Sequence, residues 1–273
     1  MVLLGGRGEF IEKYTETIKA LLERGLVVWT MDWRGQGLSS RLLPHRHKGH
    51  IDNYGTYLQD LHHFIQTKVI ADQPRPLIIL AHSMGGHIAL RYLREHQGLF
   101  TAAVFSAPMV DIQTSPFPRP FLWGVTLGAC ALGLKNLFAP TQHGFDERDC
   151  DYSRNRLTHD PERFEEAVNW FRSTPDLALG GVTFGWIFES IKSIRTLRTR
   201  AYAEGITTPV LMVNAGDEVV INPKAVEELS AWMPQGEVIS IPGSRHEILQ
   251  EVDKVQAAFW RAFDDFLQRK AGL

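Results

Sequence analysis

Cysteine is scarce in this sequence, as are long apolar runs and any surplus of one charge. The two cysteines, Cys130 and Cys150, predict neither a disulfide framework nor a cysteine-based metal site. The uncharged stretch from Phe121 to Leu134 is shorter than the roughly 18–20 apolar residues that span a bilayer. A net charge of −2 gives no strong field for nucleic acid. These scarcities argue against a nucleic-acid-binding, disulfide-stapled or membrane-spanning protein.

A signal peptide is also missing, because no basic segment followed by an apolar stretch and a cleavage site stands at the N-terminus. We therefore expect a cytoplasmic protein, with peripheral contact to a membrane left open. Its 273 residues, 44% hydrophobic and 22% charged, suit one large globular domain or one domain with an insertion.

Short apolar runs alternate with segments of helical periodicity along most of the chain, which predicts an α/β fold with a mostly parallel sheet. Between Met109 and Gly205 no buried strand is predicted, and Pro209 restarts the alternation. We expect residues 1–108 and 206–273 to form the core, and residues 109–205 to form an inserted helical cap. The expected strands are 1–4, 26–31, 77–81, 102–106, 209–214 and 237–241.

The segment from Leu77 to Leu90 has the pattern of a nucleophile elbow. The pattern predicts a buried strand that ends at Ala81, a sharp turn at Ser83, and a helix after Gly85. Small residues around the serine relieve crowding of the backbone in such a turn. A plain helix-capping serine is the alternative, but a cap requires no small residues on both sides. We therefore predict that Ser83 is a nucleophile.

A serine nucleophile needs a base and an acid that orients the base, and in α/β-hydrolases the order along the chain is Ser, Asp or Glu, then His. Asp217 and His246 each follow a predicted strand, so we predict them as acid and base. Glu218 and Asp111 remain alternative acids. His82 and His87 flank the serine and are expected to be structural.

The oxyanion formed by attack on an ester needs two backbone donors. The N–H of Met84, directly after the nucleophile, is one candidate. The loop Gly5–Gly8 follows an earlier strand, and the N–H of Arg7 is the other candidate. A plain glycine-rich turn remains the alternative for this loop.

Apolar and aromatic residues are frequent in the predicted cap. Phe121, Trp123 and Trp186 are candidates for contact with an acyl chain, together with Gly6 beside the nucleophile. Packing of the cap onto the core is the alternative explanation. The histidines at positions 45, 47, 50, 62 and 63 lack the spacing of a zinc motif, so we predict no metal and no cofactor.

Taken together, these motifs resemble the serine-hydrolase branch of the α/β-hydrolase superfamily, nearest to bacterial lysophospholipase L2 and monoacylglycerol lipase-like proteins with a serine aminopeptidase S33-type domain. The resemblance covers the chain nearly end to end. It is carried by the segments 6–14, 32–39, 49–52, 81–86, 157–163, 216–220 and 243–248.

The resemblance implies hydrolysis of carboxylic esters of single-chain lipids without a cofactor. It places the nucleophile on Ser83, the acid on Asp217, the base on His246 and the oxyanion donors on Arg7 and Met84. The implied partner is a small lipid or ester substrate. A prolyl aminopeptidase-like amidase and a non-catalytic ligand-binding protein on the same fold remain alternatives.

The N-terminal strands of the resembling proteins are missing or shortened here, since those proteins begin with further strands. The missing pair would lie beside Leu26–Met31, which would leave that strand as an open sheet edge. We expect either a truncated chain or an edge covered in a homodimer.

Overall fold

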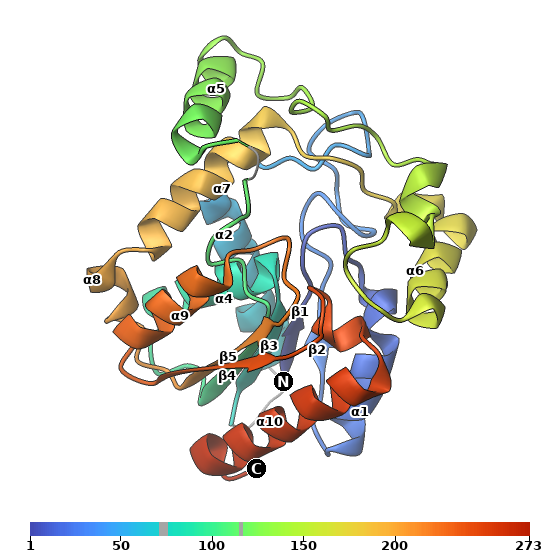
Figure 1. The fold of residues 1–273 in the computed structure, drawn as a ribbon. Helices are drawn as coiled ribbons and strands as arrows, with labels where there is room; N and C mark the ends of the chain where they lie inside the picture. Colours follow the sequence, from blue (N-terminus) through green and yellow to red (C-terminus); the bar gives the residue numbers. More distant parts are fainter. Residues whose placement is uncertain (71–75, 115–116) are drawn as a thin grey trace.

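The computed structural model describes residues 1–70, 76–114 and 117–273. Its centre is a six-stranded sheet in the order β2-β1-β3-β4-β5-β6, with every neighbouring pair parallel (Figure 1). The α/β architecture with a parallel sheet that was predicted from the sequence is confirmed. The strands are β1 (Val2–Leu4), β2 (Trp29–Thr30), β3 (Ile78–His82), β4 (Ala102–Ser106), β5 (Val210–Ala215) and β6 (Gly236–Ile241).

The central strands β1, β3, β4 and β5 are buried along their whole length. Each is apolar on both faces because helices cover both sides of a parallel sheet, and this explains their continuous apolar runs. All the strands point the same way, so the loops that follow β1, β3, β5 and β6 meet at one edge of the sheet. The predicted nucleophile, acid, base and oxyanion donors belong to these loops or directly follow them.

Helices cover the two faces of the sheet (Figure 1). On one face lies α10, whose Phe259, Phe263 and Phe266 are fully buried. Arg24, at the C-terminal end of α1, joins this helix to α10 by donating hydrogen bonds to Asp264 at 2.7 and 3.0 Å. Helices α2, α4 and α9 lie on the other face. The bounds are α1 (Thr15–Glu23), α2 (Tyr54–Phe64), α4 (Met84–Glu95), α9 (Pro223–Trp232) and α10 (Asp253–Ala271).

The sequence analysis was wrong about the segment Leu26–Met31, for which it predicted a buried strand. Only Trp29 and Thr30 pair with β1, and the side chain of Val27 is 52% exposed. The reason is position: β2 is the edge strand, so its apolar run has a neighbour on one side only. Coverage of this edge by a second copy of the chain stays a prediction, and light scattering on the purified protein tests it.

The cap, residues 109–205, joins β4 to β5 and lies above the carboxyl ends of the strands (Figure 1). Its described residues add no strand to the sheet. The division into a core, residues 1–108 and 206–273, and a cap, residues 109–205, stays a proposal. The helices of the cap are α5 (Arg119–Ala131), α6 (Pro161–Ser173), α7 (Phe184–Leu197) and α8 (Arg200–Ala203), with short turns η3 (Glu147–Cys150), η4 (Tyr152–Arg154) and η5 (Pro175–Leu177).

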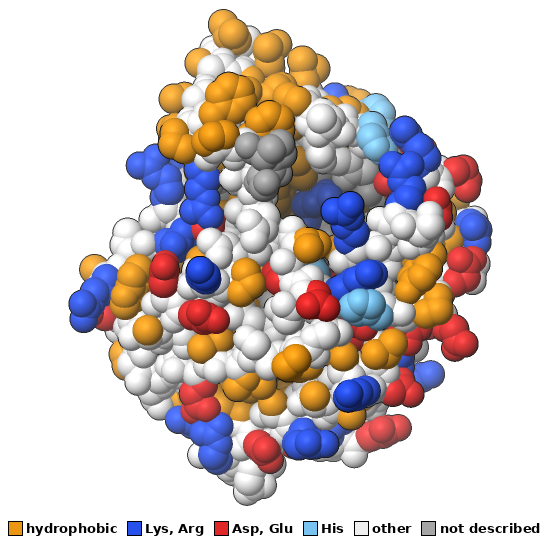
Figure 2. Space-filling model, viewed as in Figure 1, with side chains coloured by type: hydrophobic (Ala, Val, Ile, Leu, Met, Phe, Trp, Pro, Cys, Tyr) orange, Lys and Arg blue, Asp and Glu red, His pale blue; other side chains and the backbone are white. Residues whose placement is uncertain are grey.

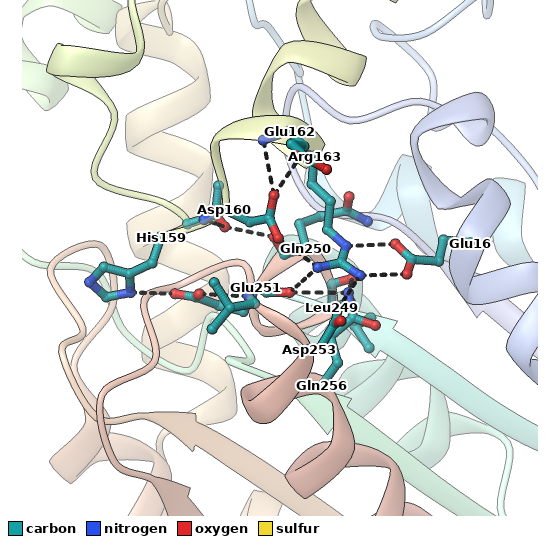
Figure 3. Close-up of polar contacts among 12 residues, drawn as sticks. Glu16, His159, Asp160, Glu162, Arg163, Leu249, Gln250, Glu251, Asp253 and Gln256 are labelled. Carbon is teal, nitrogen blue, oxygen red and sulfur yellow. Dashed lines mark hydrogen bonds and ion pairs between the residues drawn. The ribbon is translucent and has the colours of Figure 1, made fainter.

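One side of the cap, residues 155–173 with α6, is fastened to the core by ion pairs, and we call it the clasped arm. Arg163 donates to Glu16 at 2.6 and 2.7 Å, to Asp253 at 2.7 Å and to Asp160 at 2.7 Å. It also donates to the backbone oxygen of Glu251 at 2.9 Å (Figure 3). These contacts join α6 to α1 and to the start of α10.

The other side of the cap, residues 117–139 with α5, is its opposite in chemistry, and we call it the apolar arm. Figure 2 shows apolar side chains gathered at the top of the molecule, over α5. From residue 112 to residue 145 the sequence contains no aspartate or glutamate. The exposed apolar residues of this arm are Phe117, Phe121, Leu127, Leu132, Leu134 and Leu137.

Candidate active site

Ser83 lies in the sharp turn between β3 and α4, as the elbow pattern predicts. Its backbone has φ 48° and ψ −115°, a strained conformation for a residue with a side chain. A Cβ added at Gly85 would lie 2.5 Å from the Gly5 oxygen, and one at Gly86 would lie 2.9 Å from Pro108. The small residues are therefore required by close approach of the backbone.

The base predicted from the sequence contacts the nucleophile. His246 Nε2 lies 2.9 Å from Ser83 Oγ, and both residues are buried. The other ring nitrogen, Nδ1, lies 2.8 Å from Glu218 Oε2. Side chains from the loops after β3, β5 and β6 thus form one relay of hydrogen bonds, although they are far apart in the sequence.

The acid of this relay corrects the sequence analysis, which favoured Asp217. The Asp217 side chain is exposed, and its backbone N–H donates instead to the Ser244 oxygen at 2.8 Å. Glu218, weighed as an alternative, occupies the place beside His246. The other alternative, Asp111, is buried in ion pairs with Arg119 and Arg198.

Glu218 is held in an environment that keeps it charged. Burial acts to raise the pKa of this carboxyl, but the hydrogen bond and charge of His246 act in the opposite direction. The backbone N–H groups of Val220 and Ile221 also donate to it, at 2.7 and 3.2 Å. The net effect lowers the pKa of Glu218 below its ordinary value. A carboxylate at this place fixes the tautomer of the imidazole.

The physical reason for the error is the length of β5. The sequence analysis ended this strand at Asn214, whereas β5 continues to Ala215 and pairs there with Ile241 of β6. The acid-bearing loop therefore starts one residue later, and the side chain that turns toward His246 is Glu218.

The loop after β1 lies directly against the nucleophile. A Cβ at Gly6 would lie 3.1 Å from the Ser83 Cβ and 3.0 Å from the ring of His82. The backbone N–H of Arg7 donates to no acceptor among residues 1–70, 76–114 and 117–273. Met84 is fully buried at the first position of α4. The surroundings of Ser83 thus include both predicted oxyanion donors, and their role stays a proposal.

Glu9 was missed by the sequence analysis. Its buried carboxylate accepts hydrogen bonds from the N–H of Gly6 and from the hydroxyl of Tyr14, and it pairs with Lys13 at 3.1 Å. Burial acts to raise the pKa of Glu9, but Lys13 and His82, with these hydrogen bonds, lower it to about 2. Glu9 is therefore a fixed anion that holds the loop after β1 in place.

His82 and His87 are both bonded to the core. His82 Nδ1 lies 3.0 Å from the Ser106 oxygen, and its ring packs against His246 with centroids 4.9 Å apart. His87 lies between the Met109 oxygen and Ser193 Oγ, at 2.9 and 2.6 Å. Burial lowers the pKa of His87 to about 3. His87 thus stays neutral, and His82 supports the base.

The predicted substrate-contact residues are divided between different places. Gly6 is at the nucleophile, and Trp186 is buried beside the side chain of Arg7, whose guanidinium carbon lies 5.8 Å from its ring centroid. Phe121 is 56% exposed on the apolar arm. Trp123 lines a cavity of about 670 Å³ between α5 and α7 whose lining includes neither Ser83 nor His246. The structure therefore brings only Gly6 of the four to the nucleophile.

One group of described residues has the spacing of metal ligands. His143, Asp146 and Asp149 bring ligand atoms within 4.8 Å of one another on the surface of the cap. Asp146 is also paired with Arg148 at 2.6 Å, and exposed acidic groups often gather without an ion. We assign no metal to this group.

The family model described as serine aminopeptidase, S33, matches residues 1–253. The chain belongs to this family. Lysophospholipase L2 of Escherichia coli strain K12 is 31% identical over 284 residues, which cover 98% of this chain and 80% of that protein. The monoacylglycerol lipase of Mycolicibacterium smegmatis is 25% identical over 257 residues, with coverage of 93% and 83%.

Solved structures agree on the fold. A soluble variant of monoglyceride lipase from Saccharomyces cerevisiae, in complex with a substrate analog, matches with a TM-score of 0.75 at 24% identity, over 99% of this chain and 87% of that chain. Together, the family and the relatives identify this protein as an enzyme, a carboxylic ester hydrolase. None of its described helices combines the length and apolar character needed to cross a bilayer.

Proposed function

We propose that this protein hydrolyses the carboxylic ester of single-chain lipids through an acyl-enzyme on Ser83. The observation that carries the proposal is the relay from Ser83 Oγ to His246 Nε2, at 2.9 Å, and from His246 Nδ1 to Glu218, at 2.8 Å. This is the arrangement that makes a serine hydroxyl nucleophilic at neutral pH.

In the first half of the reaction, Ser83 Oγ attacks the ester carbonyl carbon while His246 takes the hydroxyl proton. The tetrahedral intermediate collapses, the bond to the leaving alcohol breaks, and His246 gives that alcohol the proton. In the second half, water attacks the acyl-enzyme and loses its proton to His246. The fatty acid leaves, and Ser83 regains its proton.

Two charges need stabilisation along this path. Glu218 stabilises the imidazolium that His246 becomes, and its lowered pKa keeps it anionic at neutral pH. The backbone N–H groups of Arg7 and Met84 are our candidates for the oxyanion, and the hydrogen bond that the N–H of Gly6 donates to Glu9 holds the loop of Arg7 in place. One such donor typically contributes on the order of 10²–10³ in rate.

The relatives support a lipid substrate. Lysophospholipase L2 and monoacylglycerol lipase are named for lipids with one acyl chain. The apolar walls that a single acyl chain needs are plentiful in the cap, where Trp123 and Phe188 stack with centroids 5.0 Å apart.

The decisive experiment compares p-nitrophenyl esters, monoacylglycerol, lysophosphatidylcholine and a prolyl amide as substrates. For the Ser83→Ala variant we expect ester turnover to fall at least about a thousandfold, to near background. Wild-type turnover in that variant would contradict the nucleophile assignment. Turnover of the prolyl amide alone would favour the amidase alternative, and turnover of nothing would favour a ligand-binding protein.

The acid is tested by a matched pair of neighbours. We expect Glu218→Gln to lower kcat on the order of 10²–10⁴, because the imidazole loses the carboxylate that orients it. Asp217→Asn, on an exposed side chain, should change kcat by less than about twofold. The reverse order of effects would restore Asp217 as the acid.

We also propose that the apolar arm touches a lipid surface during catalysis. Leu132 is 77% exposed and Phe121 56%, and the segment 112–145 contains no carboxylate. We expect Phe121→Ser combined with Leu132→Ser to reduce co-sedimentation with phosphatidylglycerol vesicles. Val27→Ser, on an exposed apolar residue of the edge strand, is the matched control, and equal binding by all three proteins would contradict the proposal.

A further inference from the structure

A second cavity, of about 420 Å³, lies beside the candidate active site, between the core and the clasped arm. Its size is within the range of small-molecule sites. It is lined on one side by Arg7, Glu9 and Lys13, which follow the loop at the nucleophile, and by Glu247, the neighbour of the base. Figure 2 shows a hollow below the apolar arm with basic side chains around it.

The cavity is lined by the cations Arg7, Lys13 and Arg163, and two of these are already neutralised. Lys13 lies between Glu9 and Glu247, at 3.1 and 2.6 Å. Arg163 has carboxylates or a backbone oxygen on Nε, Nη1 and Nη2, as Figure 3 shows. The charges of both side chains are thus balanced by carboxylates of the protein itself.

Arg7 differs from both. No carboxylate of residues 1–70, 76–114 and 117–273 lies within 4 Å of its nitrogens, and the hydrogen bond found there for its side chain runs from Nη1 to the Gly180 oxygen at 3.0 Å. The side chain is half-buried. A guanidinium has five N–H donors, so most of those of Arg7 remain for a ligand.

The surroundings hold the Arg7 guanidinium in place. Its carbon lies 5.8 Å from the centroid of the buried Trp186 ring, a cation–π contact. A Cβ at Gly49 would lie 3.1 Å from Nη1, so the guanidinium packs closely against the backbone of Gly49. A cation that is positioned by its neighbours but not neutralised by them is suited to an anionic ligand.

We infer that the Arg7 side chain binds the phosphate of a lysophospholipid headgroup and so determines specificity for phosphate-bearing over neutral single-chain esters. The inference rests on the proposed ester hydrolysis at Ser83. Guanidinium pairs with phosphate through parallel hydrogen bonds. In a lysophospholipid the glycerol links the ester to the phosphate. The proposed oxyanion role places the backbone N–H of Arg7 at the ester, and the Arg7 side chain lines the adjacent cavity.

The test uses Arg7→Met, which removes the charge but keeps the backbone N–H. We compare kcat/KM for lysophosphatidylglycerol, monoacylglycerol and a p-nitrophenyl ester with the same acyl chain. We expect the ratio of lysophosphatidylglycerol to monoacylglycerol to fall roughly tenfold to a hundredfold, as for lost charge-assisted hydrogen bonds. Arg7→Lys should restore part of the ratio. Arg163→Met, in the same cavity, should leave the ratio within about twofold because its donors serve the protein.

A binding measurement separates this inference from the proposed function. Calorimetry with the Ser83→Ala variant should detect binding of sn-glycerol 3-phosphate and none of glycerol, and Ser83→Ala combined with Arg7→Met should lose that binding. Ester turnover with an unchanged ratio in Arg7→Met would overturn the inference and leave the proposed function standing. Phosphate binding that depends on Arg7 in a protein without esterase activity would support the site and overturn the proposed function.

Discussion

The two arms of the cap differ in almost every physical property. The clasped arm is charged and bonded to the core through Arg163, whereas the apolar arm carries no carboxylate and packs through the stack of Trp123 on Phe188. Arg195 lies over the Trp123 ring of this stack, with its guanidinium carbon 5.0 Å from the ring centroid. The difference teaches that one side of the cap is fastened to the core by ion pairs, whereas the other presents large apolar side chains to solvent.

The clasped arm also holds the loop of the base. The N–H of Glu247 donates to the Leu157 oxygen at 2.8 Å, and Arg245 Nη1 donates to the Thr158 oxygen at 2.9 Å. The Glu251 carboxylate accepts from the N–H of Arg245 at 2.8 Å and lies 2.8 Å from His159 Nδ1 (Figure 3). Residues on both sides of His246 are thus bonded to the cap.

The largest effect on the difference between the two arms is expected for Arg163→Met, which removes the ion pairs of the clasped arm. Its loss leaves several carboxylates without their partner, and we expect a loss of about 2 kcal/mol of stability and a Tm lower by about 5 °C. We also expect kcat to fall, because the loop of His246 loosens. Thermal unfolding of Arg172→Met is the control: this arginine is on the same helix but pairs with Glu165 at the surface. Equal losses for both variants would contradict the special role of the clasped arm.

The contribution of the clasped arm to stability should also depend on pH. The hydrogen bonds from Arg163 hold the pKa of Glu16 below its ordinary value of 4.5. A carboxyl with a lowered pKa in the folded state contributes stability above pH 4.5 and loses it as the pH falls through the folded value. We therefore expect the Tm difference between wild type and Arg163→Met to be largest above about pH 5 and to shrink in more acidic buffer. A constant difference down to pH 3 would mean that Glu16 contributes little.

The smallest effect on stability is expected in the apolar arm. Phe121→Ser with Leu132→Ser removes side chains that are mostly exposed, so Tm should change by about 1 °C or less. The measurement is thermal unfolding beside the vesicle assay of the same variant. A large drop in Tm would show that these side chains pack the cap, and their loss of vesicle binding would then have a trivial cause.

The success and failure of the sequence analysis follow from how local each signal is. The elbow at Ser83 could be predicted because close backbone approach demands small residues nearby in the sequence. Glu218 could not be separated from Asp217, since the choice depends on how far β5 continues beside β6. The sequence also could not show that Arg7 is the cation without a carboxylate partner at its cavity. That distinction depends on Lys13 and Arg163, whose carboxylate partners Glu247 and Glu16 are distant in the chain.

The bond from Glu247 to Leu157 has a consequence for protein engineering. Exchange of the cap is one way to seek a new substrate selectivity. Here a chimera that replaced the whole segment between β4 and β5 would also discard part of the frame of the imidazole. A graft that retains residues 155–163 and exchanges only the region around α5 would keep that frame intact.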